Sequence, residues 1–293
     1  MRGLGLAMPE VPLARVAWMR RLVSPSVIFD VLVTVAAPIP HGDVPAELYR
    51  ELPVRALLGL PAPSPGYVRV LLVVIVISAL VAALGRLPRL AGAVCGLGML
   101  DWMSNAFSYS KIDHDHFALM VALLVLPTVG AARAGDLTPS RAAGWALRMI
   151  QMGVVATYFL SGVAKMRFGT WLWANGSTFV WAFSRRGNDV AQWLAGHPAL
   201  VHLTQWSLLG LEFVSPVLLW LRGRGLAIGI GICFAFHATT AYLLHIHFLP
   251  LVVCLFAFLP LERLGELRRG RARPARAGRA RPRAGSAAPS SAR

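Results

Sequence analysis

The sequence has little charge for its length. Only 14% of its 293 residues are Asp, Glu, Lys or Arg, whereas a soluble domain carries about a quarter. Hydrophobic residues make up 56% of the chain, and several apolar runs reach the roughly 18 residues that cross the hydrocarbon core of a bilayer. The low charge therefore excludes an ordinary soluble domain and predicts an integral membrane protein.

Cysteine is also scarce. Cys95, Cys233 and Cys254 all lie in apolar stretches, and no two of them form a CxxC pair. This pattern excludes a disulfide framework and a cysteine-based metal site, so we expect three small core residues. A signal peptide is not expected either, because Pro9 and Pro12 interrupt the N-terminal segment before any short apolar core.

Eight apolar segments are expected to be membrane-spanning helices. They cover about residues 16–37, 67–84, 90–107, 114–131, 143–163, 203–221, 226–244 and 248–261. The predicted fold class is therefore all-α, a polytopic transmembrane bundle of about eight spans. Residues 44–58 are expected to form an amphipathic helix on the membrane surface. The tryptophans of residues 165–202 suit a membrane interface.

Net charge is +16, a value that by itself would suggest nucleic-acid binding. The arginines instead lie in short turns between apolar runs and in the C-terminal segment, so no nucleic-acid partner is expected. If the N-terminus is cytoplasmic, every short basic loop falls on the cytoplasmic side. These loops contain Arg86 and Arg89, Arg133 and Arg141, and Arg222 and Arg224. The prediction is a multi-pass protein of the cell membrane with both termini cytoplasmic.

The chain divides into two predicted parts, a transmembrane domain over residues 1–261 and a tail over residues 262–293. The tail is rich in arginine and has too few apolar residues to fold, so it is expected to be disordered. Each arginine near an anionic leaflet contributes about 1 kcal/mol, which makes anionic lipid headgroups a partner for the tail. A solvated tail without function is an equally open interpretation.

Ionisable groups inside spans mark candidate sites, because each costs roughly 2.5–3.5 kcal/mol to insert. Asp101 and Asn105 lie one helical turn apart and share a helix face. Glu212 and His237 lie in the middle of two later spans. Hydrogen bonds between helices explain both residues as well as a site does, and a Glu212–His237 pair is one open arrangement.

Two further groups lie near span ends. His114 and His116 are two residues apart, a spacing that does not place both on one helix face, so no metal site is predicted. Both are solvated loop residues, or one of them is functional. Lys165 either extends to water from a helix end or is a partly buried lysine that acts as a base.

A longer motif surrounds this lysine. In YFLSGVAKMRFGTWLW, residues 158–173, a tyrosine-led helix ends in a small residue, Gly162 and Lys165, and tryptophan follows. The motif resembles the signature of the HTTM domain, which is shared with vitamin K-dependent gamma-carboxylases. Three further stretches are similar and occur in the same order, so that the likeness covers most of residues 15–260. They are Asp115-His116-Phe117, Leu211-Glu212 with Pro216 beyond, and Phe236-His237.

The resemblance implies roles for three residues. Lys165 would be the base that deprotonates a reduced quinone, with His116 and His237 as the site histidines. The carboxylases have a large extracytoplasmic portion after the membrane bundle and often a double lysine, whereas here a basic tail follows residue 260 and the motif reads Ala164-Lys165. A quinone-level reaction is therefore expected rather than full glutamate carboxylation.

Two other functions remain open from the sequence. The chain could be a non-enzymatic HTTM membrane protein that aids the maturation, export or immunity of a small peptide. In that case the same polar residues would only hold helices together. A transporter ranks last, since the sequence has no inverted repeat and no paired broken helices. Besides the lipid bilayer, the expected partner is therefore a quinone or a small peptide.

Overall fold

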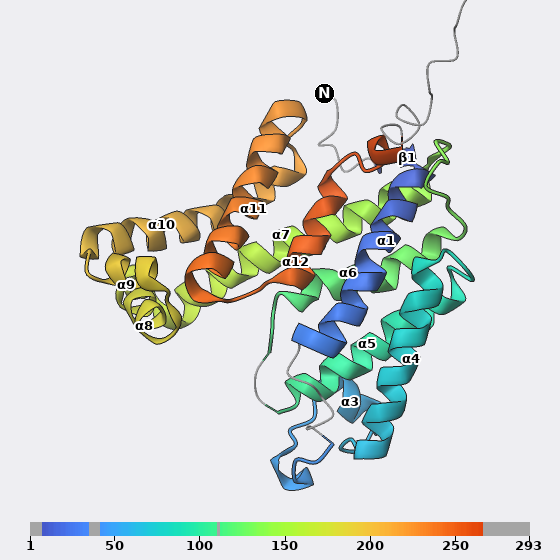
Figure 1. Ribbon diagram of the computed structural model, residues 1–293, viewed down its shortest axis with the longest axis horizontal. Helices are drawn as coiled ribbons and strands as arrows, with labels where there is room; N and C mark the ends of the chain where they lie inside the picture. The colour runs from blue at the N-terminus through green and yellow to red at the C-terminus, as the bar shows by residue number, and fades with distance from the viewer. Residues whose placement is uncertain (1–7, 35–41, 110–111, 266–293) are drawn as a thin grey trace, which may run out of the picture.

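The computed structural model describes residues 8–34, 42–109 and 112–265, and these residues are almost entirely helical (Figure 1). The α-helices are α1 (Leu13–Phe29), α3 (Pro53–Leu57), α4 (Pro65–Ala83), α5 (Leu90–Phe107), α6 (His116–Val125), α7 (Arg141–Gly169), α8 (Ser177–Arg186), α9 (Asp189–Ala195), α10 (Pro198–Val214), α11 (Gly223–Leu244) and α12 (Leu249–Leu255). Strand is confined, within the described residues, to the short antiparallel pair β1 (Val11–Pro12) and β2 (Pro139–Ser140). The predicted all-α class is confirmed. The arginine-rich tail, from residue 266 onward, lies outside the described residues.

Within the described ranges, three helices are long and apolar enough to cross a membrane: α4, α7 and α11. Helix α5 covers the whole predicted third span, 18 residues, without a break but is less apolar than these three. The remaining predicted spans coincide with helices that are shorter or interrupted. Helix α6 gives way to the 3-10 helix η3 (Leu126–Val129), and α10 gives way to η5 (Ser215–Leu219). Each change occurs at a proline, Pro127 or Pro216, which has no N–H to continue the α-helical hydrogen bonds.

The first predicted span is divided in the same way. Helix α1 ends at Phe29, and a π-helical segment, η1, continues over Asp30–Thr34. Residues 35–37 of the predicted span lie outside the described residues. Short π-helical segments are rare and often occur at functional sites. In this chain the segment begins at Asp30, a buried carboxylate.

The predicted surface helix over residues 44–58 is wrong. The chain there forms a 3-10 turn, η2 (Ala46–Leu48), and a separate short helix, α3. Pro45 and Pro53 precede or begin these pieces, and a proline in mid-helix would remove a hydrogen bond and clash with the preceding turn. Because α3 packs against the bundle, Arg55 is only 2% exposed.

The bundle core is formed mainly by α1, α4, α5, α6, α7 and α12, whose buried side chains make one continuous cluster. In Figure 1, α4 and α5 lie beside α1, whereas α8, α9 and α10 extend away from that group. Helices α5 and α6 approach closely at Gly96, where a Cβ would lie 2.9 Å from the carbonyl oxygen of Leu123. In the most apolar window of each helix, 56% of the residues are buried in α7 and 17% in α11. Helix α7 is therefore central, and α11 presents a large apolar face to its surroundings.

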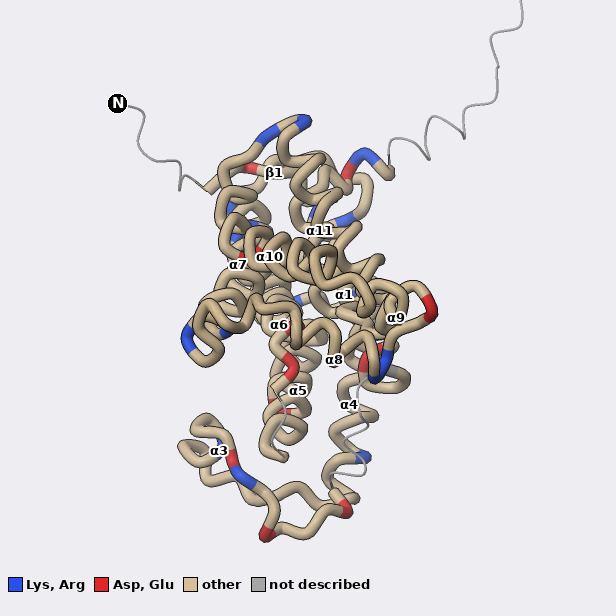
Figure 2. The backbone as a smooth tube through the Cα atoms, turned by 90° about the vertical axis from the view of Figure 1, so that its left-hand side faces the viewer, with Lys and Arg blue, Asp and Glu red and all other residues tan. Residues whose placement is uncertain are grey.

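Several loops meet at one end of the bundle, which we call the basic end. β1 pairs with β2 there, and the Arg15 guanidinium binds the Glu262 carboxylate at 2.6 Å. The Arg89 guanidinium packs on Gly130 at the same end. Figure 2 shows Lys and Arg gathered in the region of β1. The start of α1, the α4–α5 turn and the segment before α7 therefore lie together.

Two buried arginines cap helix ends in this region. Both Nη atoms of Arg20 donate hydrogen bonds, at 2.6 Å, to the carbonyls of Gly130 and Leu126. Arg148 donates from Nη1 to the carbonyl of Leu219 at 2.9 Å. The last carbonyls of a helix have no partner within the helix. These arginines therefore donate hydrogen bonds to carbonyls that η3 and η5, the two segments with a proline, would otherwise leave without a partner.

The opposite end of the bundle joins the other connections. The Arg50 N–H donates to the carbonyl of Ser108 at 2.9 Å, which ties the segment before α3 to the end of α5. The Asn188 N–H donates to the carbonyl of Leu243 at 3.0 Å, which ties the start of α9 to the end of α11. Successive long helices therefore run in alternating directions between the two ends.

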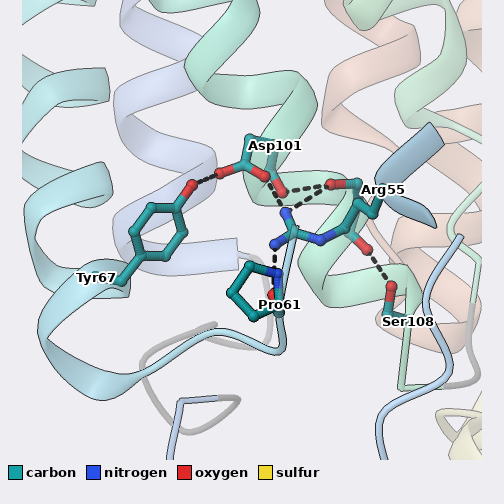
Figure 3. Close-up of polar contacts among 6 residues, drawn as sticks. Arg55, Pro61, Tyr67, Asp101 and Ser108 are labelled. Atoms are coloured by element: carbon teal, nitrogen blue, oxygen red, sulfur yellow. Dashed lines mark hydrogen bonds and ion pairs between the residues drawn. The ribbon is translucent and has the colours of Figure 1, made fainter. Parts of the chain in front are cut away.

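One polar cluster fixes α3 to α4 and α5 (Figure 3). The Arg55 guanidinium binds the Asp101 carboxylate and donates to the carbonyl of Pro61 at 3.0 Å. The Tyr67 hydroxyl donates to the other carboxylate oxygen of Asp101. The predicted cost of Asp101 inside a span is therefore offset by an arginine from a segment that we expected on the surface.

We expect Arg55→Leu and Asp101→Asn each to lower the free energy of unfolding by about 3–5 kcal/mol, because each leaves the other charge buried without its partner. The double variant Arg55→Leu/Asp101→Leu should lose less than the sum of the two single changes. Denaturant unfolding in bicelles measures all three values. Arg50→Leu is the matched control, since its guanidinium binds exposed carbonyls, and it should change stability by at most about 0.5 kcal/mol. Additive losses in the double variant would contradict a direct pair.

Candidate functional site

One face of α7 lines a small, partly open cavity, which we call the chamber. Its α7 residues are Thr157, Tyr158, Ser161 and Lys165, whose spacing places them along one helix face. The chamber has a volume of about 130 Å³. The other lining residues come from α10, α11, α12 and the segments before α6 and α12: His114, Leu208, Glu212, Phe236, His237, Phe248 and Leu251.

Lys165 turns inward, toward the chamber. Its Nζ donates to the hydroxyl of Ser161 at 2.7 Å and binds Oε1 of Glu212. The Lys165 side chain is 19% exposed, and its amine also lies 5.2 Å from the ring centre of Trp173. Of the two interpretations left open by the sequence, a lysine that extends to water is therefore not what the structure has.

Glu212 reaches Lys165 because α10 packs closely on α7. A Cβ at Gly162 would lie 3.2 Å from the Cβ of Glu212, so the glycine of the sequence motif leaves room for the carboxylate. Glu212 is 4% exposed, and its Oε2 has no hydrogen-bond partner among the described residues. A buried carboxylate usually has both oxygens satisfied. The free oxygen therefore gives the chamber an acceptor for a ligand.

His237 binds Tyr158 rather than Glu212, so the open Glu212–His237 pairing is not the one formed. The Tyr158 hydroxyl lies 2.6 Å from Nε2 of His237. The His237 side chain is buried, and its Nδ1 has no partner within the described residues. The chamber thus contains a second unsatisfied polar atom, contributed by a different helix from the first.

Lys165 and His237 both line the chamber, but His116 does not. Its Nε2 lies 3.0 Å from Oδ2 of Asp30, and its Nδ1 lies 3.3 Å from Oδ1 of Asp115. The ring is therefore held between two carboxylates, one of them at the start of the π-helical segment. Of the three residues assigned by resemblance, two meet in one cavity and the third occupies its border.

Two larger cavities adjoin the chamber on different sides. The apolar hollow, of about 440 Å³, lies between α6 and α7 and is lined chiefly by Phe107, Ile112, Phe117, Met120, Leu160 and Ala164. The polar vestibule, of about 830 Å³, is lined by three carboxylates, four histidines and Arg186 among other residues. His116 borders the hollow and the vestibule. The site is therefore a chamber that adjoins an apolar and a polar compartment, and those two compartments also adjoin each other.

His114 is the residue that sequence reasoning undervalued. It lines the chamber, the apolar hollow and the polar vestibule. The Phe248 ring separates it from His237, with ring centres 6.5 Å from His114 and 5.4 Å from His237. A helix-face analysis of residues 157–165 would have identified Thr157 and Ser161 as neighbours of Lys165. No local pattern marks His114 or Phe248, because tertiary packing alone brings them to the chamber.

The scarcity of lysine in the sequence is a second indication that Lys165 belongs to a site. The sequence has only two lysines, Lys111 and Lys165, among 29 Lys and Arg residues. Arginine binds carboxylates as well as lysine does but does not lose its proton in proteins. A lysine at the chamber wall, in a chain that uses arginine almost everywhere else, therefore fits a role that involves proton transfer.

Glu212→Gln should raise the reactivity of Lys165 toward reductive methylation by about tenfold at fixed pH, the change produced by about 1.4 kcal/mol of lost attraction. Only an unprotonated amine reacts, and the variant removes the carboxylate that holds the proton on Nζ. Mass spectrometry of the peptide that contains Lys165 measures the rate. Glu262→Gln, which breaks an ion pair at the basic end, is the control and should leave the rate unchanged. An unchanged rate in Glu212→Gln would contradict the pair.

The comparisons with known proteins add no assignment. The chain matches no protein-family model, no functionally characterised protein and no solved structure. The chemistry of this chain is therefore argued from the chamber and its two adjoining compartments.

Proposed function

We propose that this chain is a membrane-embedded enzyme that removes a proton from a lipid-soluble hydroquinone, with Lys165 as the base. The observation that carries the proposal is the placement of Lys165, Glu212 and His237 around one chamber. The chamber adjoins an apolar hollow on one side and a polar vestibule on the other. A lipid-soluble substrate needs the first compartment, and proton exchange with water needs the second.

Lys165 can act as a base only when its amine is neutral. Glu212 supplies a place for the proton, since its carboxylate already binds Nζ. In the empty site the carboxylate holds the proton on Nζ as an ion pair. A substrate that fills the chamber removes water from the pair, and separate buried charges are then costly, which favours transfer of the proton from the ammonium to the carboxylate. The Ser161 hydroxyl, at 2.7 Å, keeps the amine at the chamber wall during this exchange.

The reaction then needs dioxygen as co-reactant. A hydroquinone and one dioxygen give a quinone epoxide and water, so that the hydroquinone is oxidised and dioxygen is reduced. Lys165 starts this sequence by taking the hydroquinone proton. The resemblance to the HTTM domain and the gamma-carboxylases supports the same assignment, because it gives Lys165 and His237 their roles independently of the cavity.

Lys165→Ala is expected to lower epoxide formation by about 10²–10⁴-fold, the usual contribution of a positioned general base. Lys165→Arg should be equally inactive, because a guanidinium keeps its proton. Purified protein in nanodiscs is supplied with hydroquinone and dioxygen, and mass spectrometry measures the epoxide. Arg167→Ala, two residues further along α7, is the control and should keep wild-type turnover. Equal turnover in Lys165→Ala, or no turnover in the wild type, would refute the proposal.

The proposed enzyme crosses the bilayer about eight times, with the basic end in the cytoplasm. The alternating directions of the long helices support this arrangement, as do the arginines gathered at one end. Both termini are then cytoplasmic. Arg15 ties Glu262 to the basic end, and we expect the arginines of the tail that follows to attract anionic headgroups.

Cysteine labelling tests this orientation. A membrane-impermeant maleimide should label Thr178→Cys in intact cells, and should label Leu137→Cys only after the membrane is permeabilised. Both positions are exposed, and they lie on opposite sides of α7 in the chain. The native cysteines give no background because all three are buried. Labelling of Leu137→Cys in intact cells would reverse the proposed topology.

A further inference from the structure

The chamber has two buried polar atoms that the protein leaves unsatisfied. Oε2 of Glu212 and Nδ1 of His237 have no hydrogen-bond partner in the part of the chain that the structure describes. Both side chains are more than nine-tenths buried, at 4% and 6% exposed. A buried polar group without a partner costs about 1–3 kcal/mol. A ligand with two polar groups would satisfy both atoms at once.

The size of the chamber limits that ligand. Its volume of about 130 Å³ is slightly below the roughly 150 Å³ of an engineered apolar cavity that binds benzene. One six-membered ring therefore fits, and a fused second ring does not. Leu208 and Leu251 close the chamber from α10 and α12, and Leu251 is fully packed at 3% exposed. The walls can thus yield only by moving packed side chains, which is costly.

The apolar hollow gives a route for a substituent on that ring. It shares His114, Thr157 and Ser161 with the chamber, so the two cavities meet at these side chains. Three residues of the hollow, Ile112, Phe117 and Leu160, are about half exposed or more. Large exposed apolar side chains on a membrane helix face lipid. The hollow therefore opens sideways, between α6 and α7, to the bilayer interior.

We propose that the chamber selects substrates whose polar head is a single six-membered ring, with an apolar substituent that leaves through the hollow between α6 and α7. The substrate class is a substituted monocyclic hydroquinone rather than one with a fused bicyclic head. This inference rests on the proposed function for the reaction, but the ring selection itself depends only on the chamber. Leu208 is the residue that sets the size limit, because it faces Glu212 one helical turn away on α10.

Binding of two redox-inert probes tests the selection without turnover. The probes are a phenol and a 2-naphthol that carry the same alkyl chain. Binding to the full-length protein in nanodiscs is measured by equilibrium dialysis and corrected for partitioning into protein-free nanodiscs. The phenol should bind about tenfold or more tightly, the discrimination expected of a pocket that excludes one extra group. Equal binding, or tighter binding of the naphthol, would overturn the inference.

Two matched variants test whether Leu208 sets the size limit of the chamber. Leu208→Ala should enlarge the chamber and reduce the tenfold preference to about twofold or less. Leu209→Ala makes the same change one residue further on, at a buried position that does not line the chamber, and should keep the preference. An unchanged preference in Leu208→Ala, in protein that retains its thermal unfolding temperature, would also overturn the inference.

The same measurements separate this inference from the proposed function. Selective phenol binding without Lys165-dependent epoxide formation would refute the proposed reaction and leave the ring selection standing. Lys165-dependent epoxide formation from monocyclic and bicyclic hydroquinones at equal rates, with equal probe binding, would refute the ring selection and leave the reaction standing.

Discussion

A charge buried among apolar helices must have a partner, and this constraint shapes the whole bundle. Nearly every buried ionisable group joins elements that are far apart in the sequence. Lys165 and Glu212 join α7 to α10, Arg55 and Asp101 join α3 to α5, and His116 and Asp30 join α6 to the end of α1. Since a buried charge that loses its partner costs several kcal/mol, each pair fixes the placement of two elements. The polar pairs therefore add specific links between elements to the continuous apolar core of the bundle.

The pairs differ in how completely they are satisfied, and this difference separates structure from function. The Asp101 carboxylate has partners on both oxygens, Arg55 and Tyr67. The Glu212 carboxylate has a partner on one oxygen and none on the other within the described residues, and its side chain lines the chamber. The cation also differs, because Arg55 keeps its proton whereas a lysine can release one. A saturated arginine pair holds helices together, and an unsaturated lysine pair beside a cavity can take part in chemistry.

The sequence predicted the helices well and their interactions poorly. Apolar runs identified where helices lie, because hydrophobic length is a local property. Helix ends were less accurate where a proline changes the helix type, as at Pro127. The Arg55 partner of Asp101 was missed because a proline-rich segment gave no local reason to expect a buried arginine. The Tyr158–His237 bond and the Lys165–Glu212 pair were also beyond reach, since each depends on how α7 packs against α10 and α11. The motif around Lys165 identified the correct helix face but could not identify what stands opposite it.

The arrangement of the three cavities follows from the same constraint. A base in the membrane needs contact with an apolar substrate and with a route for protons, and no single kind of lining serves both. In this chain the two compartments meet at His114, which borders the hollow, the vestibule and the chamber. An imidazole suits that position, because it tolerates apolar contact with its ring and exchanges a proton near neutral pH. Phe248 also lines both the vestibule and the chamber, and its ring centre lies 6.5 Å from that of His114 and 5.4 Å from that of His237. The vestibule therefore reaches the chamber wall at His114 and Phe248, the two residues that both cavities share, so a proton route between them needs no other side chain.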